Sequence, residues 1–224
     1  LNNKGFSATI DILGEHVKDT IEAKKITSEY LDLFDEISEI KLDCNISIKP
    51  SHIGLDLGVK EFLSNLQLLV EKAKYHNNFL RIDMESSTIT DITINAYNEM
   101  LKTSKSVGTV FQAYLFRTLD DIKNIQNEHL NFRLCKGIYK ESKQISIQDR
   151  RLINENYLNI LRLAFTYKNY VGIATHDIDL LKKVYALINE LKVSPNLFEF
   201  QVLYGVPMSG WLEKHLVNGY KVRV

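Results

Sequence analysis

The sequence predicts a (β/α)8 barrel, and three observations support this fold class. Eight short apolar runs alternate with seven segments in which apolar residues recur at helical spacing, an order that is typical of parallel β/α folds. No Gly-x-Gly-x-x-Gly motif follows any of these runs, which argues against a doubly wound dinucleotide-binding sheet. The chain has 224 residues, 45% of them hydrophobic, which suits one globular domain with a sizeable core. We expect a single barrel domain over residues 1–224, without the helix that would follow the eighth strand.

The first half of the chain predicts four strand-and-helix units. Strands are expected over residues 7–13, 44–49, 78–84 and 108–115. The clearest amphipathic stripe runs from Phe62 to Ala73 after the second strand. The other three helical stripes begin near Thr27, Ile92 and Thr118, and Thr118 is expected to cap its helix.

The second half predicts four more strands and three helices. The strands are expected over residues 131–136, 171–175, 197–201 and 220–224. The helical stripes contain Ile153, Leu180 and Leu212, with Asp177 as the N-cap of the second and Gly219 as the C-cap of the third. The polar stretch GIYKESKQIS before the first of these helices is longer than a simple connection, so it is a candidate functional loop.

Composition narrows the classes of function. The 28 basic and 28 acidic residues give a formal net charge of +0, so no nucleic-acid partner is expected. The absence of a long apolar run argues against a membrane-spanning helix. Cys44 and Cys135 each lie inside an apolar run, which favours two buried thiols in a reducing compartment.

Polar residues gather where the apolar runs end, and in a barrel these carboxyl ends of the strands form the active-site face. The residues in question are Lys49, Asp83, Gln112, Arg133, Lys136, Thr175, His176, Glu199 and Gln201. Taken singly, each has an ordinary explanation as a helix cap or a solvated charge, and for Arg133 a structural ion pair has about even weight. Their convergence on one face is the stronger argument for a site.

The segment RIDME contributes the most charge to this face. Strand alternation sends Arg81 and Asp83 to one side and Ile82 to the other. We expect Asp83 to meet Arg133 or Lys136 and therefore to stay ionised, which suits orientation better than proton abstraction.

A metal site is not expected. His176 is a potential ligand, but only His52 is another histidine near a strand end, and a hydrolytic metal site normally needs two or three such ligands together with carboxylates.

Five segments in order carry a resemblance to a known family. They are LRIDME, FQAYL, RLCKGIYKE, ATHD and FEFQVLYGV, and they lie in that order at the ends of strands three to seven. Together they resemble the signature segments of the proline dehydrogenase family, from DILGE at residues 11–15 to the last strand. The resemblance implies a flavin-dependent (β/α)8 barrel that oxidises L-proline to Δ1-pyrroline-5-carboxylate by hydride transfer to flavin.

The resemblance also implies roles for single residues. Asp83 and Arg133 match the catalytic pair beside the flavin and the substrate, and Lys49 matches the lysine that binds the substrate carboxylate. Tyr139 and Leu203 match residues that pack around the proline ring. The residues that match FAD contacts are Met84, Gln112, Lys136, Gly137, Ile138, Thr175 and His176. Gly137 would permit close backbone approach, and Lys136 would offer a cation to an electron-rich cofactor.

The family resemblance implies partners and a location as well. Electrons would pass from the reduced flavin to a quinone. The enzyme would lie in a bacterial cytoplasm, peripherally at the membrane surface. The family's N-terminal helices and its last helix, which carries an arginine pair for the substrate carboxylate, are expected to be missing from residues 1–224.

Two other readings stay open at this point. One is a Schiff-base aldolase on the same fold, with Lys49 or Lys136 as the nucleophile. The other is a catalytically inactive flavin-binding barrel fragment, which the absent arginine pair makes less remote.

Overall fold

The strands follow one another through the sheet in chain order. The computed structural model describes residues 1–125 and 130–224, and within them the sheet has the order β1 to β8. The strands are β1 (Ala8–Ile10), β2 (Cys44–Ile48), β3 (Leu80–Ile82), β4 (Val107–Gln112), β5 (Asn131–Cys135), β6 (Tyr170–Ala174), β7 (Phe198–Gln201) and β8 (Val222–Arg223). Every strand pair with a described register is parallel. The eight expected strands are therefore confirmed.

A helix follows each of the first seven strands. The helices are α1 (Thr20–Glu39), α2 (Val59–Tyr75), α3 (Thr90–Leu101), α4 (Thr118–Ile125), α5 (Arg150–Thr166), α6 (Ile178–Leu191) and α7 (Trp211–Val217). Short 3-10 turns lie at Asn2–Lys4, Ser51–Ile53, Leu55–Leu57, Ser87–Ile89 and Pro195–Leu197. The alternation of strand and helix expected from the sequence is thus present throughout the described residues.

The chain divides into two compact units. The N-terminal unit comprises residues 8–109, and the C-terminal unit comprises residues 1–7 and 110–224. The first residues of β4 belong to the N-terminal unit and its last residues to the C-terminal unit.

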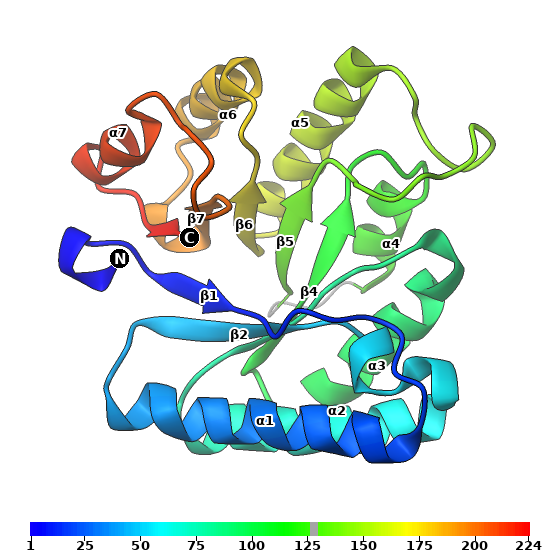
Figure 1. The fold of residues 1–224 in the computed structure, drawn as a ribbon. Helices are drawn as coiled ribbons and strands as arrows, with labels where there is room; N and C mark the ends of the chain where they lie inside the picture. Colours follow the sequence, from blue (N-terminus) through cyan, green and yellow to red (C-terminus); the bar gives the residue numbers. More distant parts are fainter. Residues whose placement is uncertain (126–129) are drawn as a thin grey trace. The chain divides into compact units, whose positions relative to one another are not determined.

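In the N-terminal unit, helices α1 and α2 pack against each other (Figure 1). The stripe predicted from Phe62 to Ala73 is the buried face of α2, and Phe62, Leu66 and Leu69 are fully buried. Burying such a stripe is what stabilises an amphipathic helix in a protein. These residues form the core of the unit.

Helix α1 begins seven residues before the expected start at Thr27. Asp19 is its N-cap, and the Asp19 carboxylate accepts a hydrogen bond from the Glu22 amide at 2.8 Å. The Glu22 carboxylate in turn accepts from the Lys18 amide at 2.8 Å. This reciprocal arrangement resembles a capping box, so the sequence DTIE held a signal for the true start of the helix.

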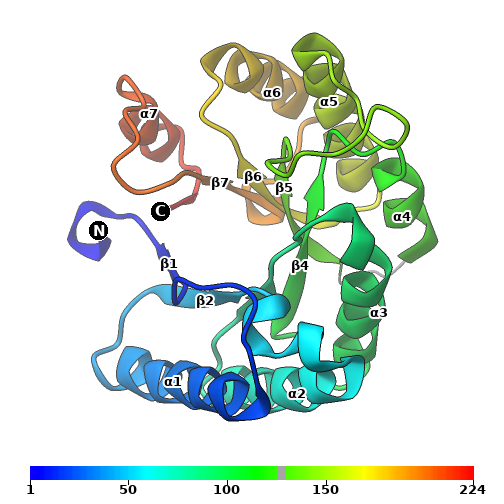
Figure 2. The ribbon, with the colours of Figure 1, turned by 45° about the vertical axis from the view of Figure 1, so that its right-hand side comes forward.

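In the C-terminal unit, helices α5 and α6 lie side by side (Figure 2). Asp177 is the N-cap of α6, as expected, and its carboxylate accepts from the amides of Asp179 and Leu180. The C-cap of α7 is Asn218, and Gly219, which was expected in that position, follows it with a φ of 75°. The Thr118 hydroxyl instead donates to the Gln112 carbonyl at 2.6 Å, so it ties the start of α4 to the end of β4.

The long connection between β5 and α5 is anchored on the segment after β4. Leu115 and Ser146 form an isolated antiparallel bridge, and the Ile147 amide donates to the Tyr114 carbonyl at 2.7 Å. The Phe116 amide donates to the Ile145 carbonyl at 3.1 Å. These bonds hold the candidate functional loop in a defined place within its unit.

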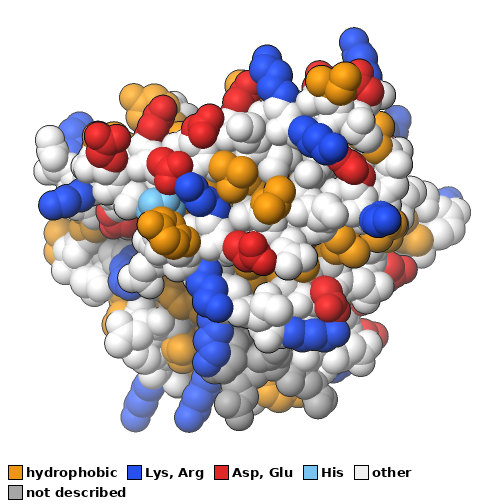
Figure 3. All heavy atoms as spheres, turned by 90° about the horizontal axis from the view of Figure 1, so that it is seen from below, with side chains coloured by type: hydrophobic (Ala, Val, Ile, Leu, Met, Phe, Trp, Pro, Cys, Tyr) orange, Lys and Arg blue, Asp and Glu red, His pale blue; other side chains and the backbone are white. Residues whose placement is uncertain are grey.

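The surface on the side of α1 and α2 mixes both signs of charge (Figure 3). Lys72 from α2 forms an ion pair with Asp35 of α1 at 2.6 Å, and His76 contacts the same carboxylate at 2.7 Å. These two partners lower the pKa of Asp35. No helix among the described residues is both long and apolar enough to cross a membrane.

Candidate functional site

Lys49 lies directly after β2 and is held by an acid from the neighbouring strand end. Its Nζ is 3.3 Å from Oδ2 of Asp11, which follows β1. Only 21% of the lysine side chain is exposed. The parallel pairing of β1 and β2 brings these two residues to the same edge.

Asp83 follows β3 and is bound to β2 of the same unit. The Ser47 hydroxyl donates to Asp83 Oδ1 at 2.8 Å, and the Asp83 amide donates to the Ile48 carbonyl at 2.8 Å. Ser47 is paired in register with Arg81, so Arg81 and Asp83 share a side of the strand as the alternation predicted. Met84, which comes next, is buried.

Glu85, the last residue of RIDME, holds the turn that follows Lys49. Its carboxylate accepts from the Ser51 amide at 2.9 Å and from the Ser51 hydroxyl at 2.6 Å. Burial raises the pKa of Glu85, although these two hydrogen bonds oppose the shift. Sequence analysis gave Glu85 no role, because its partner lies 34 positions away along the chain.

Gly137 is a position where only glycine fits. Its φ is +117°, and a Cβ placed there would lie 2.2 Å from Cδ1 of Tyr114. Burial raises the pKa of the Tyr114 phenol to about 12. The close neighbour seen here is therefore a tyrosine ring, and the approach of a cofactor to Gly137 stays a prediction. Gln112, at the end of β4, is almost fully buried.

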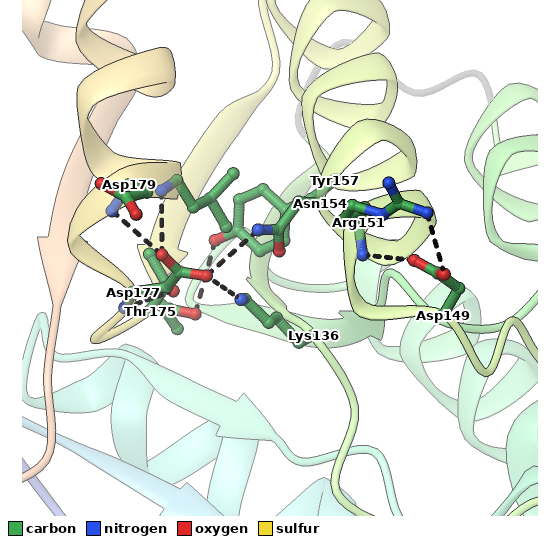
Figure 4. A network of polar contacts seen from close by, with 10 residues as sticks. Lys136, Asp149, Arg151, Asn154, Tyr157, Thr175, Asp177 and Asp179 are labelled. Atoms are coloured by element: carbon green, nitrogen blue, oxygen red, sulfur yellow. Dashed lines mark hydrogen bonds and ion pairs between the residues drawn. The ribbon is translucent and has the colours of Figure 1, made fainter.

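Lys136 is joined to the end of β6 through Asp177. Its Nζ lies 2.5 Å from Oδ2 of Asp177, and Nδ2 of Asn154 donates to the same oxygen at 3.1 Å (Figure 4). Burial alone would raise the pKa of the Asp177 carboxyl. Lys136, the Leu180 amide and Asn154 outweigh burial and hold the pKa well below its ordinary value. One acid thus caps α6 and fixes a lysine that the sequence predicted to be a cofactor contact.

Tyr157 of α5 contacts the two strands that lead to this ion pair. Its side chain is fully buried, and its hydroxyl lies 2.8 Å from the Leu134 carbonyl and 3.4 Å from the Ala174 carbonyl (Figure 4). These carbonyls belong to the ends of β5 and β6. Asn154 and Tyr157 were missed by sequence analysis, because periodicity does not tell what a helix contacts.

His176 and Leu203 are hydrogen-bonded to each other. The Leu203 amide donates to Nε2 of His176 at 2.9 Å, so this ring nitrogen carries no proton. Burial lowers the pKa of His176, which favours the neutral ring. Thr175 is buried, whereas Leu203 is 69% and Ile138 is 85% exposed. Tyr139 is half-buried.

Arg133 belongs to a polar chain of contacts whose members come from β5, β7 and β8. Its Nε donates to Oε1 of Gln201 at 2.7 Å. Nε2 of Gln201 donates to Oε1 of Glu199 at 2.7 Å, and Nε of Arg223 donates to the same oxygen at 2.7 Å. Both Glu199 and Gln201 are buried. Sequence analysis placed Arg133, Glu199 and Gln201 on the active-site face but did not find Arg223.

The polar residues therefore form two sets, one in each unit. Lys49, Asp83 and Met84 lie in the N-terminal unit, and the remaining predicted site residues lie in the C-terminal unit. A contact between Asp83 and Arg133 or Lys136 stays a prediction.

Comparison with known proteins decides the family. The family model described as proline dehydrogenase matches residues 1–224. The chain belongs to the proline dehydrogenase family. It is 36% identical over 225 residues to proline dehydrogenase 1 of Bacillus subtilis subsp. natto, covering 100% of this chain and 74% of that protein. It is 29% identical over 234 residues to proline dehydrogenase of Deinococcus radiodurans, again covering 100% of this chain and 74% of the relative.

A solved structure supports the fold class. The chain superimposes on proline utilization A (PutA) from Bdellovibrio bacteriovorus, described as inactivated by N-propargylglycine, with a TM-score of 0.88 at 20% identity. The match covers 99% of this chain and 28% of that longer chain. The (β/α)8 barrel class expected from the sequence is confirmed.

Family membership confirms the enzyme class expected from the sequence. Proline dehydrogenases oxidise proline to Δ1-pyrroline-5-carboxylate, and the family is generally flavin-dependent. For the aldolase reading, the structure adds that Lys49 and Lys136 are each paired with an aspartate. Family membership, rather than these contacts, decides against the aldolase reading.

Proposed function

We propose that the flavin is FAD and that the strand ends of the C-terminal unit hold it. The observation that carries this proposal is the clustering of Lys136, Thr175 and His176 at the ends of β5 and β6. Asp177 contacts both Lys136 and Thr175, and the Leu203 amide contacts His176. Tyr157 contacts the strand end before Lys136. The proposed set also includes Gln112, Gly137 and Ile138 from the same unit, together with Met84.

The chemistry of these side chains fits such a cofactor. Lys136 presents a cation, which suits a diphosphate or an electron-rich ring. The neutral His176 ring and the exposed Ile138 side chain can contact an extended aromatic group without adding charge. Bound FAD would supply the acceptor for the hydride that leaves the carbon next to the proline nitrogen.

The chain's own residues would bind and orient the substrate. We propose that the Lys49 ammonium attracts the proline carboxylate, and that Tyr139 and Leu203 cover the ring and exclude water. Arg133 and Asp83 would be the catalytic pair, with the Arg133 cation stabilising negative charge that develops on the acceptor. The reduced enzyme would then pass its electrons to a quinone at the cytoplasmic surface of a bacterial membrane.

The first experiment is an absorption spectrum of the purified full-length protein, followed by L-proline without oxygen. We expect a flavin spectrum that bleaches as proline is added. A flavin spectrum that proline leaves unchanged would point to an inactive flavin-binding barrel. A colourless protein that does not take up added FAD would contradict the cofactor assignment.

The role of Lys49 has its own test. Replacing Lys49→Met should raise the KM for proline about 10-fold or more, because the substrate carboxylate loses its cation. The matched control is Lys72→Met, since Lys72 is an ion-paired lysine of the same unit on the outer face of α2. Steady-state kinetics measure both, and an unchanged KM in Lys49→Met would remove this residue from the substrate site.

A reoxidation assay tests the acceptor. A short-chain quinone should reoxidise the proline-reduced enzyme faster than dissolved oxygen does. If oxygen is the faster acceptor, the quinone assignment is wrong.

A further inference from the structure

Gln201 has an amide whose orientation is fixed by two partners of different kind. Its Oε1 accepts from Nε of Arg133 at 2.7 Å, and its Nε2 donates to Oε1 of Glu199 at 2.7 Å. Turning the amide over would place two donors together on the arginine side and two acceptors together on the glutamate side. The side chain is 6% exposed, so water does not readily take either place.

Glu199 is itself anchored. Its carboxylate is 3% exposed and is paired with Arg223 at 2.7 Å, while the arginine side chain is 15% exposed. A buried carboxylate keeps its charge only with such a partner. The Arg223–Glu199 pair therefore fixes the direction in which Gln201 presents its Oε1 to Arg133.

Gly172 supplies the space for this amide. In the sheet it is paired with Arg133 of β5 on one side and with Glu199 of β7 on the other. A Cβ at Gly172 would lie 2.4 Å from Nε2 and 2.7 Å from Cδ of Gln201. The Gln201 amide thus spans β6 over a position that has no side chain, and it links the strands on either side.

We propose that Gln201 is a positioning residue for Arg133, with Glu199 and Arg223 as its anchor and Gly172 as the opening that lets it reach. This inference rests on the proposed function, in which Arg133 acts beside the flavin. Without the amide, the Arg133 guanidinium loses the acceptor that fixes its Nε edge. A bond to an ionised donor is among the stronger hydrogen bonds in proteins.

The experiment is a double-mutant cycle between the two residues. The rate of flavin reduction by proline is measured without oxygen for Arg133→Met, Gln201→Met and the double variant. We expect a loss of about 100-fold for Arg133→Met and of about 10-fold for Gln201→Met. If Gln201 acts through Arg133, the double variant equals Arg133→Met alone.

A second double-mutant cycle uses Gly172, whose missing side chain leaves room for the Gln201 amide. Gly172→Ala should displace the Gln201 amide and slow reduction about as much as Gln201→Ala does, whereas adding Gly172→Ala to Gln201→Ala should have no further effect. This cycle needs no loss of a charge, so it serves even where the Arg133 variants fold poorly. The control is Gln67→Met, because Gln67 donates to Glu71 at 2.9 Å on the exposed face of α2.

The reduction potential of the bound flavin gives a readout apart from turnover. A fixed cation favours the electron-rich reduced flavin, so Gln201→Met and Gly172→Ala should lower the potential in the same direction as Arg133→Met. A purely structural role predicts additive rate losses with no change in potential, and that result would overturn the inference. If Arg133→Met itself changes neither the rate nor the potential, the proposed role of Arg133 fails instead.

Discussion

The two faces of β7 are both buried, yet they treat polar groups in opposite ways. Glu199 and Gln201 point to one face and belong to the hydrogen-bonded chain with Arg133 and Arg223. Phe198 and Phe200 point to the other face, where Phe200 stacks on the His215 ring with centroids 3.7 Å apart. The strand reads FEFQ, so simple alternation assigns the four side chains to their faces.

The difference lies in how each face keeps a titratable group. On the polar face an arginine and an amide pair with the Glu199 carboxylate. On the aromatic face the histidine is fully buried, and Tyr185, Trp211 and Phe200 surround it. Burial, helped by the nearby Lys214, lowers the pKa of His215 to about 4, so this ring is neutral. The polar face thus holds a carboxylate paired with an arginine, whereas the aromatic face holds a neutral histidine ring.

The largest expected effect comes from removing the Glu199 carboxylate from the polar face of β7. Glu199→Leu leaves Arg223 and the Gln201 amide without their shared acceptor in a buried place, which should destabilise the fold by about 3 to 5 kcal/mol. Chemical denaturation measures this loss. The control is Glu190→Leu, whose pair with Arg162 at 2.7 Å lies on the surface, and we expect little change there. Equal effects in the two variants would mean that burial of the pair does not matter.

A somewhat smaller effect tests the aromatic face through pH. The folded-state pKa of His215 lies below its ordinary value of 6.5, so the unfolded chain binds a proton more readily than the folded chain. The stability is complete above about pH 6.5 and decreases as the pH falls toward 4. We expect His215→Phe to reduce the difference in unfolding free energy between pH 7.5 and pH 4.5 by about 2 kcal/mol.

The exposed His16 provides a control of opposite sign. Its hydrogen bond to Asp56 raises the pKa of His16, so its contribution is present at low pH and decreases as the pH rises through that pKa. A His16→Gln variant should leave the acid sensitivity due to His215 in place. If the His215→Phe variant is as acid-sensitive as the parent, His215 is not the neutral buried base described above.

The smallest expected effect concerns Asp177, which lies outside β7, at the start of α6. Asp177→Ala removes the cap of α6 and the partner of Lys136. It should lower the free energy of unfolding by about 1 to 2 kcal/mol. Asp177→Asn should recover most of the capping part, because asparagine is also a good N-cap. Since the pKa of Asp177 is lowered, its contribution is complete above about pH 4 and decreases as the carboxyl is protonated.

The neighbouring helix offers a matched control for that comparison. Asp149 caps α5 through the Arg151 and Leu152 amides and contacts Arg151, and it makes no described contact with Lys136 (Figure 4). Thermal unfolding of Asp149→Ala reports the cap alone. A loss in Asp177→Ala no larger than in Asp149→Ala would show that the Lys136 pair adds nothing to stability.

Much of this fold follows from periodicity. Eight strands and seven helices were expected, and residues 1–125 and 130–224 contain them, because the period of 2 along a strand and of 3.6 along a helix is set by local backbone geometry. Element ends were less well predicted. The run 7–13 contains only the strand Ala8–Ile10, since an apolar run continues past the last hydrogen-bonded pair.

The sequence by itself determined which polar residues stand at the strand ends, and the five signature segments in order determined the family. Only the tertiary structure decided the partner of each polar side chain. Lys136 meets Asp177, Arg133 meets Gln201, and Glu199 meets Arg223, across separations of 41, 68 and 24 residues. The physical reason is that alternation is a property of consecutive residues, whereas a buried charge is stabilised by whichever donor the folded sheet and its helices bring within hydrogen-bonding distance.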